Sequence, residues 1–278
     1  MTTTAAAPPP AGVVPSSPLR KGGVLRPLRS FRILLPFAAL IAVWWAIWAS
    51  SEFSPQVLVS PVAVWHAFLH LVSYGVLAEY ASTSLTMIGF AALLSLVVGV
   101  PIGFAVGVNR YAAHALEGFL RFLQGISGIA WLPLAIIWFG FTHTTTLVIV
   151  VYTLIVPIVF NTMIGVRAIP EPYMLALRSL GASRLRMVKD VYLPGALPSI
   201  VVGLRLGMGY GWRALIAAEM LVRKGGLGDL IFGARTFGQI DRIITGMIVI
   251  GCLYVVVDRL IVQPIENLTV ARWGVLRQ

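Results

Sequence analysis

The sequence predicts an all-α fold, a polytopic membrane bundle of about six transmembrane helices. Three observations predict it: 58% of the 278 residues are hydrophobic, the mean hydropathy is +0.90, and only 11% of the residues are charged. Soluble domains contain about 45–50% apolar and about 25% charged residues. One core of a water-soluble fold cannot bury this much apolar surface, so the excess must face lipid.

Six apolar segments meet or approach the roughly 20 residues that a helix needs to cross the hydrocarbon core. They are residues 33–50, 81–108, 119–141, 145–166, 199–221 and 243–262. Together they define a transmembrane domain over residues 33–262. Before it we expect a disordered tail, residues 1–32, with a retained anchor rather than a cleaved signal peptide after it. A second tail, residues 263–278, follows the domain.

The stretch at residues 51–80 is too broken for a span. Apolar residues recur there at helical spacing after Ser60 and Pro61, which predicts a short helix at the membrane interface. His66 and His70 are four residues apart but have no third ligand nearby, so we expect no metal site.

The distribution of cationic residues predicts the orientation, because Lys and Arg resist translocation near the ends of spans. One side receives 15 of the 21 cations, from the two tails, Arg110, Arg121 and the loop at residues 167–198, and the other side receives four. We therefore expect both termini in the cytoplasm, and the bias explains the net charge of +11 without nucleic acid. The remaining two cations lie inside the fifth span; Arg205 can snorkel, whereas Arg213 lies deeper.

The sequence contains no motif for nucleotide binding or catalysis. Lys21, Lys189 and Lys224 do not follow glycine, so there is no Walker A motif. Neither H-E-x-x-H nor G-x-S-x-G occurs, and Cys252 is the single cysteine. We expect a protein that is not an enzyme, with no catalytic residue, cofactor or metal of its own.

The loop at residues 167–198 is the most informative segment. Pro172 can open a short helix that Gly181 closes in a left-handed conformation, and Ser183 can cap a second helix that stops before Pro194. Two short amphipathic helices joined by such an elbow suit a docking surface for a cytoplasmic partner.

This loop resembles the cytoplasmic loop of the membrane-spanning subunits of binding-protein-dependent ABC importers, whose pattern is E-A-A-x-x-x-G-x9-I-x-L-P. The matching positions are Ala176, Gly181, Val191, Leu193 and Pro194. Leu175 stands where the pattern has Glu and Leu177 where it has the second Ala, so the first polar contact is absent while the elbow is retained.

Segments around the loop look like the nitrate, sulfonate and taurine branch of this family. They are AWLPLAIIWFG at 130–140, RSLGAS at 178–183, LPGALP at 193–198, AAEM at 217–220 and GLG at 226–228. The resemblance covers residues 80–265 or so and implies a type I importer permease in the bacterial inner membrane.

The resemblance also implies partners. They are a second copy of the chain, two ABC ATPase subunits that hold ATP and Mg²⁺, and an extracytoplasmic solute-binding protein. The residues implied to couple to the ATPase are Ala176, Leu177, Gly181, Ala182, Ser183, Val191, Leu193 and Pro194. Closure of the ATPase pair would move the two loops and switch the spans between inward-open and outward-open arrangements.

Glycines repeat every four residues in two of the predicted spans. They are Gly99, Gly103 and Gly107 in the second span, and Gly203, Gly207 and Gly211 in the fifth. Each helix therefore has a smooth face, for which we expect close packing, with lining of a pathway as the alternative.

Arg213 lies past the middle of its span, about 21 Å along the helix from Ser199. No carboxylate lies three or four residues away, and a charge at this depth costs at least ~2.5 kcal/mol. It should face a wet cavity, an acid or an anion, either as a pathway residue or as a structural or outer-gate charge. With Trp212 and Glu219 it makes up the candidate substrate pathway, and Arg223 is the expected partner of Glu219.

Arg213 and the resemblance together favour a small anion such as a sulfonate, nitrate or bicarbonate, although similar proteins also carry uncharged heterocycles. One alternative is a secondary transporter or channel that works without ATP, which should show internal repeats. A membrane-embedded enzyme is the other, and it should carry acids or histidines at one depth of the bundle.

Overall fold

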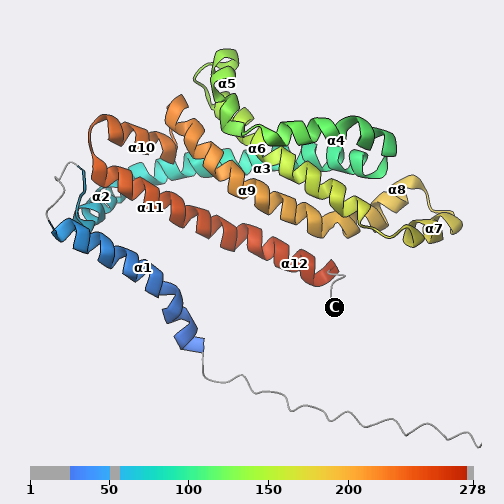
Figure 1. The fold of residues 1–278 in the computed structure, drawn as a ribbon, viewed down its shortest axis with the longest axis horizontal. Coiled ribbons are helices and arrows are strands. Elements are labelled where there is room, and N and C mark those ends of the chain that lie inside the picture. The colour runs from blue at the N-terminus through green and yellow to red at the C-terminus, as the bar shows by residue number, and fades with distance from the viewer. Residues whose placement is uncertain (1–25, 51–56, 274–278) are drawn as a thin grey trace, which may run out of the picture. The chain divides into compact units, whose positions relative to one another are not determined.

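A computed structural model describes residues 26–50 and 57–273 of the protein, and within these ranges the regular elements are helices, with no strand (Figure 1). The all-α prediction is confirmed. The chain divides into two units, Met1–Glu52 and Phe53–Gln278. The first contains α1 (Arg26–Ala49), which begins seven residues before the predicted span and whose apolar part, Leu35–Ala49, is shorter than a typical crossing.

The second unit contains all the other helices of the described residues. In chain order they are α2 (Pro61–Ser73), α3 (Val76–Val108), α4 (Arg110–Gly125), the 3₁₀ turn η1 (Gly128–Trp131), α5 (Leu132–Phe139), α6 (His143–Arg167), α7 (Glu171–Ser179), α8 (Arg184–Met187), the π segment η2 (Val188–Tyr192), α9 (Leu193–Val222), α10 (Leu227–Thr236), α11 (Ile240–Val257), the π segment η3 (Asp258–Val262) and α12 (Gln263–Trp273).

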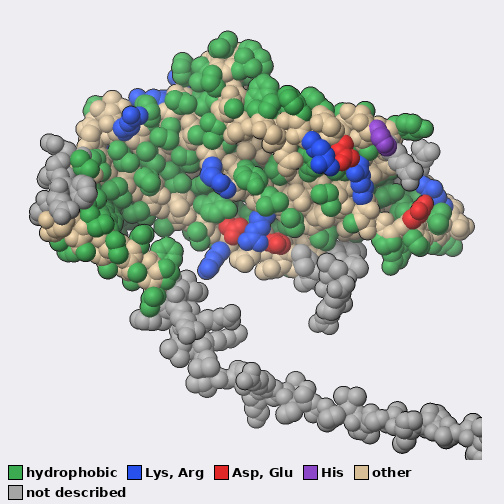
Figure 2. Space-filling model, viewed as in Figure 1, with side chains coloured by type: hydrophobic (Ala, Val, Ile, Leu, Met, Phe, Trp, Pro, Cys, Tyr) green, Lys and Arg blue, Asp and Glu red, His purple; other side chains and the backbone are tan. Residues whose placement is uncertain are grey.

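Four helical runs are long and apolar enough to cross a membrane, which confirms four of the six predicted crossings. They are Val76–Val108, His143–Arg167, Leu185–Val222 and Ile240–Thr269. On the face shown in Figure 2, hydrophobic side chains cover much of the surface and charged side chains gather in a few small groups. Such a surface suits contact with lipid and with other apolar chains.

The short helix predicted after Ser60 and Pro61 is confirmed as α2. The Ser60 hydroxyl accepts a hydrogen bond from the Ala63 N–H at 3.0 Å, and Pro61 occupies the first turn. Val64 is buried on one face of this helix, whereas Trp65 is exposed on another face.

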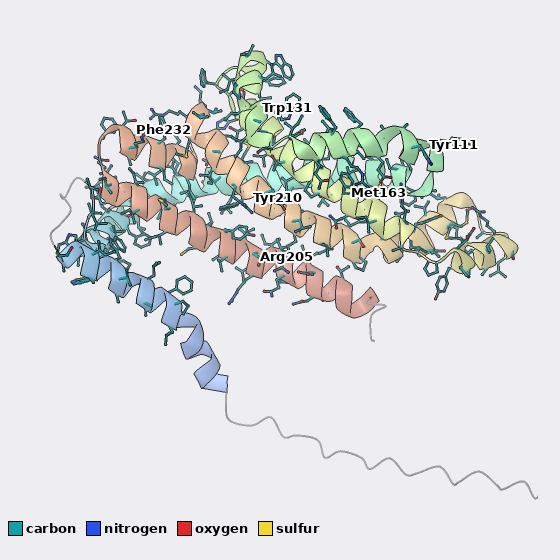
Figure 3. The ribbon with its side chains drawn as sticks, in the orientation of Figure 1. Tyr111, Trp131, Met163, Arg205, Tyr210 and Phe232 are labelled. Atoms are coloured by element: carbon teal, nitrogen blue, oxygen red, sulfur yellow. The ribbon has the colours of Figure 1, made fainter. Side chains whose placement is uncertain are left out.

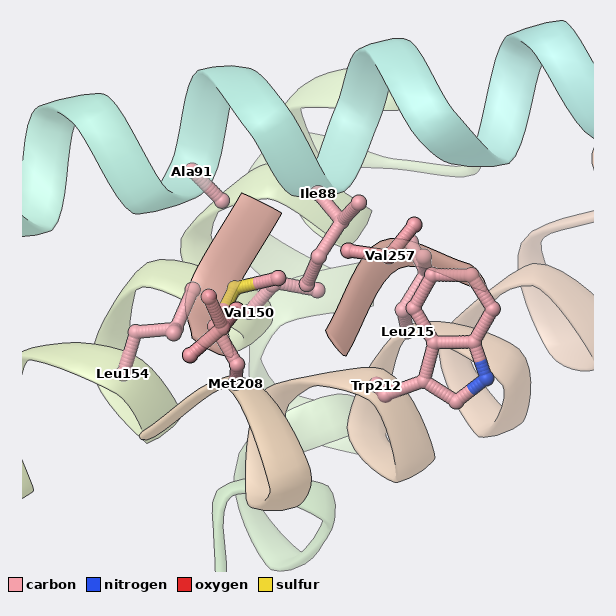
Figure 4. Close-up of a cluster of buried hydrophobic side chains, with 9 residues drawn as sticks. Ile88, Ala91, Val150, Leu154, Met208, Trp212, Leu215 and Val257 are labelled. Carbon is pink, nitrogen blue, oxygen red and sulfur yellow. The ribbon is translucent and has the colours of Figure 1, made fainter. Parts of the chain in front are cut away.

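Helix α6 lies between α3 and α9 at the centre of the bundle, and the glycine faces make this possible. Gly103 of α3 lies against the backbone of Val159, and Gly203 of α9 lies against Pro157 and Asn161. The glycines therefore serve close packing, as expected. The largest apolar cluster joins the same three helices with α11, and Figure 4 shows Leu154 of α6 and Met208 and Trp212 of α9 within it.

The segment predicted as one crossing at residues 119–141 is not one continuous helix. Helix α4 ends at Gly125, and the helical segment Gly128–Phe139, which contains α5, makes an angle of 85° with it (Figure 1). Gly128 fits at this break because any side chain there would overlap the Thr153 hydroxyl. The carbonyl of Leu123, at the break, accepts hydrogen bonds from the Ile126 N–H at 3.1 Å and from the Tyr152 hydroxyl at 2.7 Å, and such partners allow broken helices in apolar surroundings.

Two other predicted helix ends are also wrong. The second helix of the 167–198 loop does not stop before Pro194, because the π segment η2 widens the turn there and the run Leu185–Val222 continues as one helix. The expected C-terminal tail is helical as far as Trp273. Residues 1–25 and 274–278 of the two expected tails lie outside the described residues.

Candidate functional site

The elbow predicted in the 167–198 loop is present. Helix α7 ends in a pair of backbone hydrogen bonds: the Gly181 N–H donates to the Arg178 carbonyl and the Ala182 N–H to the Leu177 carbonyl, both at 3.0 Å. This is the Schellman arrangement, and it requires the left-handed φ of +72° that Gly181 adopts. No atom lies within 4 Å of the position that a Gly181 side chain would take, so backbone conformation alone favours glycine.

Ser183 caps the next helix, as predicted. Its hydroxyl accepts a hydrogen bond from the Arg186 N–H at 3.3 Å, and its carbonyl accepts one from the Met187 N–H at 3.0 Å. Four apolar side chains around this turn are more than half exposed: Tyr173, Leu175, Leu180 and Leu185. We call them the elbow surface. Leu175, where the motif has Glu, thus belongs to an exposed apolar patch of the kind that marks protein contacts.

The predicted coupling residues fall into two groups. Ala176, Leu177, Gly181, Ala182 and Ser183 lie together at the elbow, at the end of α7 and the start of α8. Val191, Leu193 and Pro194 lie further along, in η2 and the first turn of α9.

A pocket of about 500 Å³ lies at the break between α4 and η1. It is bounded by the segment around Gly128, by Tyr152 and Thr153 of α6, and by Tyr210 and Arg213 of α9. Tyr210 is labelled on α9 in Figure 3, and Trp131 marks the turn after the break. Sequence reasoning did not predict this pocket, because it missed the break.

Arg213 is the cation of this pocket. Its Nε donates to the Gly209 carbonyl at 3.0 Å, and its guanidinium lies 5.5 Å from the centre of the Tyr210 ring. Within residues 57–273 no carboxylate forms an ion pair with it. Of the surroundings expected for Arg213, the structure therefore shows an open cavity and not an acid from another helix.

Trp212 and Glu219 do not line the pocket with Arg213. Trp212 is 4% exposed and belongs to the apolar cluster in Figure 4. Glu219 is 3% exposed, and both its carboxylate oxygens accept hydrogen bonds from the hydroxyl of Ser84 in α3. The three candidate pathway residues thus occupy three different surroundings.

The predicted pair of Glu219 with Arg223 is wrong. Arg223 has a φ of +55° at the end of α9, which takes it off the helical path on which residues four apart face each other. Its Nε instead contacts the Asp229 carboxylate at 3.2 Å, and Asp229 also accepts a hydrogen bond from the Gly225 N–H at 3.0 Å.

Arg205 has carboxylate partners instead of simply extending toward water. Its guanidinium contacts Asp258 at 3.5 Å and also bonds to Glu266, both from the last helical run. These two acids are eight residues apart, which places them on one face of a continuous helix. That spacing is the signal in the sequence by which this pairing could have been found. Among the described residues no group of three or more potential metal ligands occurs.

Comparisons with known proteins identify the family of the chain. The family model for the binding-protein-dependent transport system inner membrane component matches residues 95–262. The taurine transport system permease protein TauC of Escherichia coli (strain K12) is 32% identical over 78% of this chain and 80% of its own length. The nitrate import permease protein NrtB of Synechocystis sp. is 31% identical over 88% of this chain and 92% of its own length.

A solved chain of the MetNI methionine ABC transporter in an inward-facing conformation shares 18% sequence identity, with a TM-score of 0.49, and covers 69% of this chain. The extent of the family match and the sequence identity to TauC establish the family of this chain. The chain belongs to the family of binding-protein-dependent transport system inner membrane components, the permease subunits of ABC importers of the nitrate, sulfonate and taurine branch.

Proposed function

We propose that this permease forms the translocation pathway for a small anion and that the pocket at the α4 break is part of that pathway. The observation that carries the proposal is the guanidinium of Arg213, which lines the pocket without a carboxylate partner in the described part of the chain. An unneutralised charge within a span is costly, so its position calls for a wet, anion-accessible surface.

The break in the helix supports the same conclusion. The segment that begins at Gly128 starts beside the pocket, and the first N–H groups of a helix carry partial positive charge and lack intrahelical partners. Broken helices expose such ends to anionic groups in other transporters. Relatives named for taurine, aliphatic sulfonates, nitrate and bicarbonate are consistent with an anionic solute.

The energy for transport would enter through the elbow surface. Two ATPase subunits would each receive one elbow of a homodimer in the inner membrane, with both termini in the cytoplasm, and a solute-binding protein would deliver the anion at the opposite side. This chain would bind no nucleotide itself; ATP and Mg²⁺ would reside on the ATPase subunits. The exposed apolar side chains Tyr173, Leu175, Leu180 and Leu185 support a docking role.

The test of the pathway is transport by the complete importer, reconstituted in liposomes with its ATPase and binding protein. Replacing Arg213→Gln should lower uptake of nitrate or methanesulfonate about tenfold or more, because a hydrogen bond to a charged group is lost. Arg213→Lys should retain more uptake than Arg213→Gln. The matched control is Lys224→Gln, which removes an exposed cation outside the pocket.

ATP hydrolysis should remain close to that of the unaltered importer in the Arg213→Gln variant, since the elbow is intact. Uptake of both anions at the level of the Lys224→Gln control would contradict a pathway role for Arg213. Uphill uptake by the chain without ATP would contradict the proposed importer as a whole.

A further inference from the structure

A buried carboxylate connects three helices at the end of the bundle that holds α10. Glu219 of α9 accepts hydrogen bonds from the Ser84 hydroxyl of α3, at 2.8 and 2.9 Å, and from the Gly228 N–H of α10, at 3.0 Å. The Ser84 oxygen in turn accepts a hydrogen bond from the Leu227 N–H at 2.9 Å. We call Ser84, Glu219, Leu227 and Gly228 the carboxylate knot.

The backbone of the following loop is shaped around this carboxylate. Gly226 has a φ of +94°, and any side chain there would overlap the Glu219 carboxylate. A side chain on Gly228 would overlap the Ile216 carbonyl and lie 2.8 Å from the Glu219 Cβ. The Gly-Leu-Gly sequence therefore brings the first turn of α10 directly onto the end of α9.

The carboxylate has no cation to neutralise it within the described residues. Arg223, the cation nearest in sequence, bonds to Asp229 at 3.2 Å, and no ion pair involves Glu219. Burying a carboxyl group this way costs free energy even when its hydrogen bonds are made, and an apolar side chain would fill the space at a lower cost. A knot that costs stability but fixes three helices suggests a role in positioning.

The knot and the elbow lie at opposite ends of one helix. The run Leu185–Val222 begins two residues after Ser183, passes through the π segment and contains Glu219 near its other end, about 51 Å from Leu185 at 1.5 Å per residue. Figure 1 shows α7 and α8 at one end of the bundle and α10 at the other. A displacement of the elbow therefore reaches the knot through a continuous element.

We propose that Glu219 is a positioning residue for transport. Its carboxylate ties the ends of α3 and α10 to α9, so that the three helix ends follow a movement of the elbow as one body. This inference rests on the proposed function, in which the elbow receives motion from the ATPase. Without the knot, α9 would still move, but α3 and α10 would no longer follow it.

The experiment separates positioning from stability with paired substitutions in the reconstituted importer. Ser84→Ala combined with Glu219→Met removes both polar side chains of the knot and keeps apolar volume, but it leaves the N–H groups of Leu227 and Gly228 without acceptors, so some loss of stability is expected. Glu219→Gln retains a side chain that accepts the Gly228 hydrogen bond and should rescue function. Ser95→Ala is the matched control, because Ser95 is equally buried in α3 but bonds to Val151 of α6.

Two quantities are measured for each variant. The first is solute taken up per ATP hydrolysed, which should fall about fivefold in the double variant and stay near the control value in Glu219→Gln. The second is the labelling rate of a cysteine introduced by Thr236→Cys at the exposed end of α10, after Cys252→Ser removes the native thiol. In the control, the labelling rate should change when ATP is trapped on the ATPase subunits. In the double variant, trapped ATP should leave the labelling rate unchanged.

Unchanged uptake per ATP and unchanged nucleotide-dependent labelling in the double variant would overturn the proposal. So would a double variant that does not accumulate in the membrane, or a Glu219→Gln variant as defective as the double, because either result indicates a structural role only. Failure of the proposed function is distinguishable: it appears as ATP-independent uptake in the unaltered importer, whereas failure of this inference leaves the unaltered importer ATP-driven.

Discussion

Gly103 of α3 lies directly against the backbone of Val159 in α6. A methyl group placed on Gly103 would be 2.5 Å from the Val159 carbonyl oxygen and 2.6 Å from the Thr162 Cβ. Contacts of this kind cannot be relieved by a change of rotamer, because a backbone atom is involved. The α3–α6 distance is therefore set by the absence of a side chain at this position.

Replacing Gly103→Ala should push α3 and α6 apart and destabilise the purified protein by about 1–3 kcal/mol, the usual range for overpacking. Thermal unfolding in detergent measures the effect. Gly89→Ala is the control, since no atom lies within 4 Å of the corresponding position in the same helix. Equal melting temperatures for the two variants would contradict this description of the interface.

Replacing Gly181→Val should disrupt the elbow without affecting the spans. The left-handed conformation costs a residue with a side chain about 1–2 kcal/mol, and a β-branched residue more. The Schellman hydrogen bonds of α7 should therefore be lost. Uptake per ATP should fall while the membrane level is unchanged. Gly181→Asn is the informative companion, because Asn tolerates this conformation and there is open space for it. A Val variant that couples as well as the Asn variant would show that the elbow conformation is not needed.

Replacing Arg205→Gln should be more destabilising than Asp258→Asn. The first change leaves the carboxylates of Asp258 and Glu266 close together without a cation, whereas the second leaves Arg205 with one acid. Because the Arg205 side chain is 41% exposed, solvent screening limits the loss to about 1 kcal/mol. Adding Asp258→Asn to Arg205→Gln should recover part of the loss. Denaturation of the purified variants tests this ranking. An Arg205→Gln variant that is more stable than the Asp258→Asn variant would contradict it.

Replacing Gly128→Ala should reduce anion uptake by altering the pocket. The new methyl group would overlap the Thr153 hydroxyl, so the segment after the break must shift. Combining it with Thr153→Ala removes the overlapping atom and should restore much of the uptake. If the double variant is no better than the single one, crowding against Thr153 is not the cause.

The elements predicted well from the sequence are those whose signals are local. Apolar length located four crossings, and the elbow was predicted because Gly181 and Ser183 act on residues within five positions of themselves. The break after Gly125 was missed because Gly and Pro inside an apolar run are also found in straight spans. The break is stabilised by a hydrogen bond from Tyr152 and fits closely against Thr153, and both residues lie in another helix.

Charged side chains were predicted less well, because their partners lie far away in the chain. A spacing of four residues suggested Arg223 for Glu219, yet the side chain that bonds to Glu219 is Ser84, which is 135 residues away. Arg205 similarly finds its acids in the last helical run. Local periodicity describes the faces of a helix but does not say which helix will pack on each face.

The length of the run Leu185–Val222 has a mechanical consequence. At 1.5 Å per residue its 38 residues extend about 57 Å, nearly twice the ~30 Å of a hydrocarbon core. A rigid tilt of this helix about the tightly packed glycines of its middle would move its two ends in opposite directions. A tilt of about 5° around the midpoint shifts the two tips by about 2.5 Å in opposite directions. A small displacement of one end of the helix would therefore move the other end in the opposite direction.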